Sequence, residues 1–285
     1  MPRSLVFLVT GSSSGIGRAI AREAAAVGHR VFASARNPED LAELSRPGVL
    51  EPIALDVTDA PSVTRALDTV RDRAGRLDVL VNNAGWGQMG AVEDVSIERW
   101  RALFEVNVFG LLRVTQAALP LMRSGGGGSI VNIGSIAGRI SYPFGGAYCA
   151  SKFAVEAISD ALRLEVERFG IRVVLIEPGP IESRFAQRAE AEVQSLAADA
   201  SSPYRDLYET AYERFRLETK AGALPPEAVA RVVLKAAASR RPRARYLVTR
   251  PAKVFALAKR LLPDAVIDAG MRSKFRSRKP EGGRA

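Results

Sequence analysis

One stretch decides the fold of this chain: Leu5-Val6-Phe7-Leu8-Val9-Thr10-Gly11-Ser12-Ser13-Ser14-Gly15-Ile16-Gly17. The first five residues are apolar and rich in β formers, which predicts a strand that is buried on both faces. Apolar residues recur at helical spacing beyond the turn, which predicts a helix that begins within the glycines. Such a helix start binds anions, because its free backbone N–H groups and its dipole face the turn.

The glycine-rich turn predicts where a pyrophosphate would bind. Its spacing is G-x-x-x-G-x-G rather than the G-x-G-x-x-G of the standard dinucleotide fingerprint. Its position directly after the first strand still favours a dinucleotide-binding fold. The residues expected to hold the pyrophosphate are Gly11, Ser13, Ser14, Gly15, Ile16 and Gly17.

The end of the second predicted strand, Arg30 to Ala35, indicates which dinucleotide is bound. Proteins that bind NAD place a carboxylate for the ribose hydroxyls about 20 residues after the glycines. Here Arg36 follows the strand, with no carboxylate to repel a 2′-phosphate, and its guanidinium could pair with that phosphate. We expect NADP(H) over NAD(H); the alternative is that Arg36 is a solvated surface residue.

Ser135, Tyr148 and Lys152 form a candidate catalytic set. A tyrosine is a poor acid or base at neutral pH, since its ordinary pKa is about 10. Lys152 lies one helical turn after Tyr148 on the same face, and its charge is expected to lower the tyrosine pKa. A serine hydroxyl nearby could orient a carbonyl or alcohol oxygen. The set predicts proton transfer to or from a substrate oxygen.

Strand and helix patterns alternate along the whole chain, which predicts an α/β fold with a parallel sheet covered on both faces. We expect a single Rossmann-type, doubly wound catalytic domain over residues 1–250 and a basic extension over residues 251–285. The run Gly125–Gly128 is expected to be a flexible connection between a helix and a strand, not a domain boundary. Seven strands are expected to start near Leu5, Arg30, Leu50, Leu77, Ser129, Arg172 and Ala244.

Taken together, these residues resemble the short-chain dehydrogenase/reductase family, in its single-domain branch, over roughly residues 4–250. Further markers follow in the family's order: an acid after the third strand, Asn-Asn-Ala-Gly after the fourth, and Pro-Gly after the sixth. The resemblance implies that the cofactor contacts Arg36, Asp56, Val57, Asn83, Ala84, Gly85, Tyr148, Lys152, Pro178, Gly179, Ile181 and Ser183 besides the glycine-rich turn.

The resemblance also implies a role for each catalytic residue. Tyr148 is the general acid in reduction and the general base in oxidation, and Ser135 orients the substrate oxygen. Lys152 lowers the tyrosine pKa and bonds the nicotinamide ribose, and Asn107 supports a water that relays protons. The nicotinamide carries the hydride, so no metal is required. The implied protein is an NADP(H)-dependent oxidoreductase that forms a homodimer or homotetramer.

The segment of about residues 180–225 is expected to be a lid that determines substrate specificity. It contains the apolar and aromatic residues Phe185, Leu196, Tyr204, Leu207, Tyr208, Tyr212, Phe215 and Leu217, with Tyr142, Pro143 and Phe144 close to the catalytic tyrosine. These residues either line an apolar pocket or pack the lid onto the body. A long lid with a basic extension resembles hydroxysteroid and retinol dehydrogenase-like members, which implies an apolar ketone, aldehyde or alcohol. Its identity and the direction of reaction stay open.

Two rival functions remain. A sugar-nucleotide epimerase or dehydratase is disfavoured by the glycine spacing and by the little room for a separate substrate domain. A regulator that only senses NADP would not need Asn107, Ser135, Tyr148 and Lys152 together.

The charge of the chain is concentrated at its end. From Arg240 onward there are fourteen Lys or Arg and three Asp or Glu, a net +11, whereas the first 239 residues sum to −1. An apolar stripe that includes Val254, Leu257 and Leu261 lies among these basic residues. This segment is expected to dock on the enzyme or a partner subunit; weak contact with an anionic membrane surface is an alternative, and no nucleic-acid module accompanies the charge.

The remaining chemistry of the sequence is limited. Cys149 is the sole cysteine and is expected to be a small buried residue, and His29 is the sole histidine, too isolated for a metal site. No apolar stretch of 18 residues is evident, so we expect no membrane span. The first strand leads straight into the glycine turn, so it is not a signal peptide, and a cytoplasmic location is expected.

Overall fold

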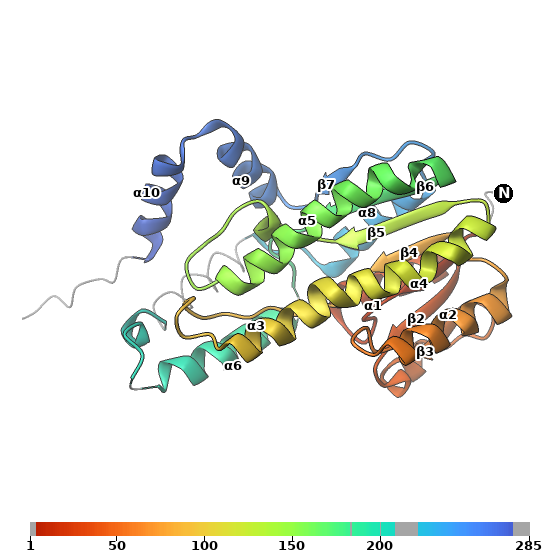
Figure 1. The fold of residues 1–285 in the computed structure, drawn as a ribbon, viewed down its shortest axis with the longest axis horizontal. Helices are drawn as coiled ribbons and strands as arrows, with labels where there is room; N and C mark the ends of the chain where they lie inside the picture. The colour runs from red at the N-terminus through yellow and green to blue at the C-terminus, as the bar shows by residue number, and fades with distance from the viewer. Residues whose placement is uncertain (1–3, 183, 200, 209–221, 276–285) are drawn as a thin grey trace, which may run out of the picture.

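A computed structural model describes residues 4–182, 184–199, 201–208 and 222–275. Its centre is a seven-stranded parallel sheet in the order β3-β2-β1-β4-β5-β6-β7 (Figure 1). The strands are β1 Val6–Val9, β2 Arg30–Ala35, β3 Leu50–Ala54, β4 Val79–Asn82, β5 Gly128–Ile133, β6 Ile171–Glu177 and β7 Arg245–Leu247. The expected seven-stranded, doubly wound parallel sheet is confirmed, and the strands start within two residues of the predicted positions.

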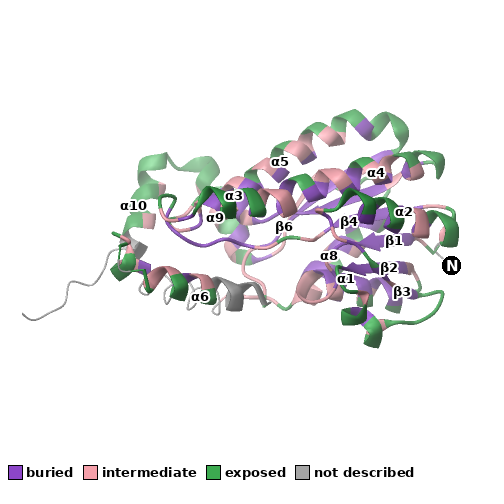
Figure 2. Ribbon diagram, turned by 60° about the horizontal axis from the view of Figure 1, so that its bottom comes forward, coloured by how far each residue is buried: buried purple, intermediate pink, exposed green. Residues whose placement is uncertain are grey.

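Helices cover both faces of the sheet, and the central strands β1 and β4 are buried along their whole length (Figure 2). α1 (Gly15–Ala26) and α8 (Pro226–Ala238) pack on one face, where Ile20 and Val233 are fully buried. α2 (Ala60–Ala74), α4 (Leu111–Ser124) and α5 (Gly146–Val166) cover the other. The sheet order reverses between β1 and β4, and α/β proteins bind ligands in the crevice at such a point.

Short elements connect these layers. The chain reaches β3 through η1 (Pro38–Leu44), reaches α5 through η3 (Ile136–Gly138), and leaves α5 through η4 (Glu167–Phe169). The segment predicted to be a lid contains α6 (Arg184–Ala197), and two further helices, α9 (Arg250–Leu261) and α10 (Asp264–Phe275), follow β7.

A continuous helical segment over Ile97–Ser124 departs from the expectation of no long apolar stretch. α3 (Ile97–Phe104) passes into the π-helical η2 (Glu105–Gly110) and then into α4. The segment has 28 residues, and a window of 18 has a mean hydropathy of 1.3 with 44% of its residues buried. Its length and composition alone would suffice to cross a membrane. That is weak evidence, because core helices of soluble proteins pass the same test.

The glycine run Gly125–Gly128, which connects α4 to β5, makes several backbone contacts. Gly127 N–H donates to Met122 O over 2.9 Å, and Gly128 N–H donates to Gly170 O over 3.1 Å. A Cβ on Gly127, where φ is +104°, would lie 2.4 Å from Gly170 O. Glycine is therefore required here by a left-handed backbone and by close contact with the next connection.

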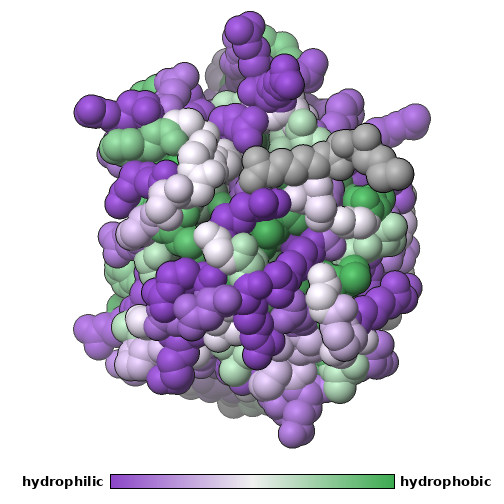
Figure 3. Space-filling view, turned by 90° about the vertical axis from the view of Figure 1, so that its right-hand side faces the viewer, coloured by the Kyte–Doolittle hydropathy of each residue, from purple (hydrophilic) through white to green (hydrophobic). Residues whose placement is uncertain are grey.

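The two ends of the sheet differ. The face at the amino ends of the strands is largely hydrophilic, with apolar residues in small separate patches (Figure 3). At the opposite end, α9 and α10 project from the body (Figure 1). Within α9, all of which the structure describes, Ala252 is the buried residue. The exposed apolar side chains of the two helices and their connection are Val254, Leu257, Leu261, Leu262 and Val266.

Candidate active site

The glycine-rich turn packs directly on the loop after β4. Asn83 Nδ2 donates to Thr10 O over 2.9 Å and to Gly11 O over 3.0 Å. The buried Thr10 hydroxyl oxygen accepts from the N–H groups of Asn83 and Ala84. Gly11 has φ +68°, and a Cβ there would lie 2.9 Å from Ala84 Cα. Thr10 was not among the predicted site residues, yet it ties the two loops together.

The start of α1 is an open anion site. Ser14 is the N-cap residue, and its hydroxyl makes no capping hydrogen bond. The first turn of α1 contains no acidic residue. A Cβ on Gly17 would lie 2.4 Å from Gly11 O, so only glycine lets the helix approach the turn this closely. These groups fit a pyrophosphate, since its charge would meet free N–H groups and the helix dipole.

Arg36 and Asp56 lie at the far end of the same site, after β2 and β3. Asp56 Oδ1 accepts from Thr58 N over 2.8 Å and from Thr58 Oγ1 over 2.7 Å. Burial would raise the pKa of Asp56, but these hydrogen bonds and the charges of Arg36 and Arg113 lower it overall. Arg36 is exposed and has no ion pair within the described part of the chain, so its guanidinium is available for a phosphate.

A cleft of about 720 Å³ runs from this region to the candidate catalytic residues at the carboxyl ends of the strands. Of the predicted residues, Gly17 and Asn107 do not line it, and Ser183 lies outside the described residues. Those that line it are Gly11, Ser13, Ser14, Gly15, Ile16, Arg36, Asp56, Val57, Asn83, Ala84, Gly85, Ser135, Tyr148, Lys152, Pro178, Gly179 and Ile181.

Ser135 is held at the end of β5. It is the N-cap residue of η3, and its hydroxyl oxygen accepts from Ala137 N over 3.1 Å. Ile136 N–H donates to Pro178 O over 2.9 Å, which joins this loop to the Pro-Gly turn after β6. Ser135 also hydrogen-bonds the Tyr148 side chain, so the two predicted catalytic hydroxyls meet in the cleft.

The ionisation of Tyr148 differs from the expectation. Burial raises the pKa of Tyr148 to about 12, although the hydrogen bond with Ser135 opposes the shift. Lys152 Nζ donates to Ile133 O over 2.9 Å and lies 5.9 Å from the centre of the tyrosine ring. Burial lowers the pKa of Lys152 to about 8, so the lysine charge is itself disfavoured and does not offset the burial of the phenol.

Asn107 lies in the π-helical η2 and is 2% exposed. Its Nδ2 donates to Trp86 O over 2.9 Å and to Ser151 Oγ over 3.1 Å, and its Oδ1 accepts from Trp86 N over 3.0 Å. Ser151 Oγ in turn donates to Tyr148 O. Asn107 thus joins the loop after β4 to the helix that carries Tyr148; the relay water stays a prediction.

The lid side of the cleft contains a pair that the sequence analysis missed. Arg99 of α3 and Glu192 of α6 both line the cleft and form an ion pair of 3.2 Å. Glu192 Oε2 also accepts from Met89 N over 3.1 Å, and the Arg99 guanidinium lies 5.5 Å from the Trp86 ring centre. Acids and bases alternate along the predicted lid, so nothing in the sequence singles out this pair.

A small apolar cluster packs the predicted lid against the loop after β4. Tyr208 is 1% exposed and packs with Met89, Ala91 and Val193. Its hydroxyl donates to Asp94 and accepts from Ala91 N over 3.0 Å. Tyr142, Phe144, Leu196 and Tyr204 pack against this cluster, so part of the predicted lid residues do pack onto the body. The side chains of Phe185, Tyr212, Phe215 and Leu217 lie outside the description.

The structure agrees with the prediction for the sole cysteine of the chain. Cys149 is 2% exposed, as expected, and burial raises the pKa of its thiol to about 11. Among the residues described, no group of three His, Cys, Asp or Glu side chains is arranged to hold a metal ion.

The parallel sheet, the glycine-rich anion site and the Ser-Tyr-Lys cleft define a dinucleotide-dependent oxidoreductase. Residues 5–194 match the family model for short chain dehydrogenase, and the chain belongs to that family. The predicted family is therefore confirmed; its hydroxysteroid or retinol dehydrogenase-like branch stays a prediction.

Three relatives show how closely known proteins resemble the chain. The NADPH-dependent 3-dehydrocapnine reductase of Ornithobacterium rhinotracheale is 38% identical over 273 residues, 92% of this chain and 94% of the relative. The 3-ketodihydrosphingosine reductase of Bacteroides thetaiotaomicron is 34% identical, over 94% and 96%. A short-chain dehydrogenase of known structure from Streptomyces avermitilis is 34% identical, with a TM-score of 0.78 and 96% of each chain covered. The expectation of an NADP(H)-dependent oxidoreductase agrees with the name of the first of these relatives.

Proposed function

We propose that this enzyme reduces a ketone on a largely apolar substrate with NADPH, and catalyses the reverse oxidation when product and NADP⁺ accumulate. The observation that carries the proposal is the single cleft that joins Ser135, Tyr148 and Lys152 to the helix start at Gly15 and to Arg36. Reduction needs a proton donor beside a hydride donor. Tyr148, the proposed proton donor, lies in the part of the cleft where we expect the nicotinamide to bind.

The chemistry of the residues supports the direction. The bound nicotinamide supplies the hydride. Tyr148, whose raised pKa keeps it protonated at neutral pH, donates its proton to the substrate oxygen. The Ser135 hydroxyl donates a hydrogen bond to the same oxygen and orients it. Lys152, held by Ile133 O, would bond the nicotinamide ribose and pass a proton back to the phenolate.

Arg36 supports NADPH as the cofactor. Its exposed guanidinium follows β2, beside Asp56, where an adenosine ribose would lie. The first relative described above is named as NADPH-dependent, in agreement with this assignment.

The relatives' names and the lid support an apolar ketone. One name specifies a 3-keto compound and the other a 3-dehydro compound, and both specify a reductase. Trp86, Val106 and Tyr142 line the cleft, and the apolar cluster around Tyr208 adjoins it through Tyr142. Arg99 and Glu192 add one charged pair to this lining. Such a lining suits a long chain with a polar group near its ketone.

The remaining parts of the chain receive separate roles in this proposal. Residues 1–250 form the catalytic domain, with the lid at about 180–225. The protein assembles as a homodimer or homotetramer through exposed apolar side chains of the helices after β4 and β5, such as Phe109, Phe153 and Leu164. Residues 251–285 give weak contact with an anionic membrane surface, because α9 and α10 expose apolar side chains in a basic segment.

The Tyr148→Phe variant tests the reaction. Removing one hydroxyl should lower kcat by at least about 100-fold, the lower range for general acid catalysis, while NADPH binds as before. The assay is NADPH oxidation with 3-ketodihydrosphingosine and medium-chain ketones, beside NADPH binding by fluorescence. Tyr246→Phe, which removes the hydroxyl of a tyrosine on β7 that does not line the cleft, is the matched control and should keep most activity. Turnover by Tyr148→Phe close to that of the wild type would refute the mechanism.

A further inference from the structure

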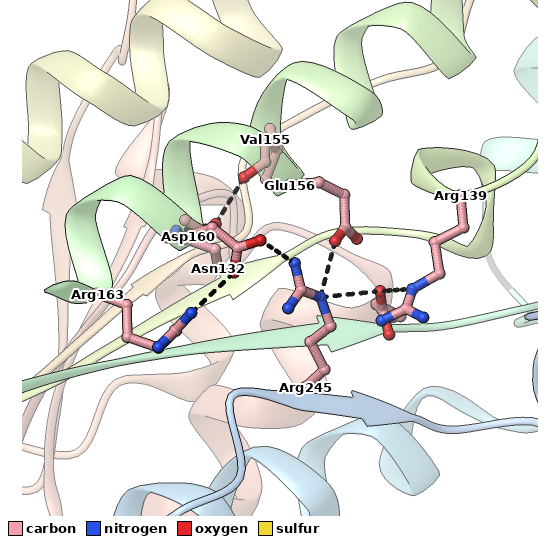
Figure 4. Close-up of polar contacts among 9 residues, drawn as sticks. Asn132, Arg139, Val155, Glu156, Asp160, Arg163 and Arg245 are labelled. Atoms are coloured by element: carbon pink, nitrogen blue, oxygen red, sulfur yellow. Dashed lines mark hydrogen bonds and ion pairs between the residues drawn. The ribbon is translucent and has the colours of Figure 1, made fainter.

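Hydrogen bonds and ion pairs join a cluster of charged residues from α5, β6, β7 and the loop after η3 (Figure 4). Arg245 of β7 donates to Glu156 Oε2 of α5 over 3.0 Å and to Asp160 over 2.5 Å. Arg139, just after η3, donates to Glu177 Oε1 over 2.5 Å, and Arg245 Nε lies 3.9 Å from the same oxygen. Glu177 ends β6, and its side chain is 0% exposed. None of these residues takes part in the reaction as proposed.

Two carboxyl oxygens of this cluster, one from Glu156 and one from Glu177, are buried without an arginine partner. Glu156 Oε1 and Glu177 Oε2 are both buried and bond no other group in the described chain. The Glu156 carboxyl nevertheless hydrogen-bonds the Glu177 side chain. Two carboxylates cannot bond each other, because neither has a hydrogen to donate. One proton between these oxygens satisfies both groups, while the other oxygen of each still accepts from an arginine.

The pair connects the three catalytic segments: the Ser135 loop, the Tyr148–Lys152 turn of α5, and Pro178-Gly179. Glu156 lies one helical turn after Lys152, and Glu177 immediately precedes Pro178. The Ser135 loop is held from both sides, since Arg139 bonds Glu177 and a Cβ on Gly138 would lie 2.9 Å from Glu156 Cγ.

We propose that Glu156 and Glu177 share one proton and, in that state, act as positioning residues that hold the three catalytic segments together. The positioning role rests on the proposed function, because that function is what makes the three segments catalytic. The shared proton does not depend on it. Loss of the proton would place two negative charges side by side in a buried site and push α5 away from β6.

The charges around the pair agree with one retained proton. Burial, then the hydrogen bond and charge of Glu177, raise the pKa of Glu156 to about 8 against the opposing effect of Arg245. Among the described residues, the charged groups that contact the pair are Arg139 after η3 and Arg245 on β7, and Asp160 of α5, with its partner Arg163, bonds Arg245 in turn. The negative charge of Asp160 neutralises part of the positive charge of Arg245, so the two arginines do not fully compensate two carboxylates.

The raised pKa of Glu156 makes the stability of the protein fall as the pH rises. A carboxyl whose folded pKa lies above its unfolded value stabilises the protein fully below about pH 4.5, and this contribution is lost as the pH rises through about 8. Glu156→Gln keeps an N–H donor toward Glu177 at every pH. The variant should therefore gain stability relative to the wild type as the pH is raised from 5 to 9.

Two measurements on the full-length protein test the pair without any turnover. Infrared spectra near pH 7 should show the band of a protonated carboxyl group that Glu156→Gln lacks and Asp160→Asn retains. Urea midpoints should rise for Glu156→Gln relative to the wild type between pH 5 and pH 9, and not for Asp160→Asn. Absence of the band in the wild type, or equal behaviour of the two variants, overturns the shared proton.

A third measurement tests positioning. Glu156→Gln should keep the wild-type kcat at pH 7 and exceed it several-fold at pH 9, with KM for NADPH unchanged at both. Asp160→Asn should follow the wild type. A shared proton in the infrared with no difference in the kcat profile would overturn the positioning role alone, and a failure of Tyr148→Phe to lose activity would overturn the proposed reaction alone.

Discussion

Tyr148 and Lys152 lie in one cleft, yet burial moves their pKa values in opposite directions, to about 12 and about 8. Burial disfavours whichever form is charged, so it keeps the phenol protonated and makes the ammonium group easier to deprotonate. Both effects oppose formation of the phenolate, because the phenol becomes a weaker acid and the nearby ammonium group is less readily charged. At the scale of single residues, the cleft therefore holds a protonated tyrosine that is a weaker acid than free tyrosine.

The buried lysine should cost stability. Its pKa falls from 10.5 to about 8, and at 1.36 kcal/mol per pKa unit the charged form costs about 3 kcal/mol. The folded state binds fewer protons than the unfolded state in this window, so the penalty disappears as the pH rises from 8 to 10.5. Lys152→Met should therefore be more stable than the wild type at pH 7 and lose that advantage near pH 10.5. Urea unfolding at both pH values measures this; an advantage that does not change would contradict it.

Arg36 should determine the choice of cofactor. Arg36→Asp removes a charge-assisted hydrogen bond worth about 1.5–3 kcal/mol and repels a 2′-phosphate. The ratio of kcat/KM for NADPH to that for NADH should fall by about 100-fold or more. Arg22→Asp, an exposed change of equal charge on α1, should leave the ratio unaltered. An unchanged ratio in Arg36→Asp would show that the arginine is merely a surface residue.

At the scale of elements, the described part of the predicted lid contacts the body at two places, among others. Glu192 of α6 bonds Arg99 and Met89, and Tyr208 bonds Asp94 and Ala91. Both sets hold it against α3 and the segment between β4 and α3. These parts of the body therefore help to position the predicted lid beside the cleft.

Tyr208→Phe should loosen the lid. The hydroxyl is buried and bonds two groups, so its loss leaves Ala91 N–H unsatisfied at a cost of about 1–3 kcal/mol. We expect lower stability in urea and a higher KM for the ketone, with little change in KM for NADPH. Tyr204→Phe loses an exposed bond to Glu93 and should be nearly neutral. Equal effects of the two substitutions would contradict the assigned role of Tyr208.

Elements that depend on local patterns could be predicted from the sequence, whereas contacts between distant segments could not. The strand before Thr10 and the helix after it follow from apolar spacing, and the lysine follows the tyrosine by one turn of a single helix. The bond from Lys152 to Ile133 and the contact of Glu156 with Glu177 join positions 19 and 21 residues apart. Their geometry depends on how α5 packs on β5 and β6, which a pattern of residue types does not specify.

The wrong expectation about the Tyr148 pKa has the same origin. The spacing of Tyr148 and Lys152 is a local property, and it correctly places them on one helix. The depth to which both side chains are buried is a property of the packed layers. Burial dominates both pKa values, so the ionisation could not be inferred from the spacing alone.

At the scale of the whole molecule, basic charge and apolar exposure coincide in α9 and α10. Between Arg250 and Phe275 there are six Lys or Arg and two Asp or Glu, a net +4, and the exposed apolar side chains of α9 and α10 lie in the same segment. The amino ends of the strands, at the opposite end, are largely hydrophilic (Figure 3). A membrane contact through α9 would therefore place the carboxyl ends of the strands, and the cleft, on the membrane side.

Vesicle binding tests this orientation. Burial of a leucine in an apolar medium is worth about 1.5–3 kcal/mol, so the double substitution Leu257→Ser and Leu261→Ser should weaken binding by at least about 10-fold. Co-sedimentation with phosphatidylglycerol-containing vesicles is the measurement. Val27→Ser changes another exposed apolar residue, 61% exposed at the end of α1, and should bind as the wild type does. Undiminished binding of the double variant would exclude α9 as the contact.

The position of Cys149 has a practical consequence for studying the lid. Its thiol is 2% exposed, and burial raises its pKa to about 11, so it will react slowly with maleimides at neutral pH. A cysteine introduced on the exposed face of α6 could then carry a fluorophore alone, without first removing the native one. The fluorescence of that label would then report any movement of α6 during turnover in an otherwise unaltered chain.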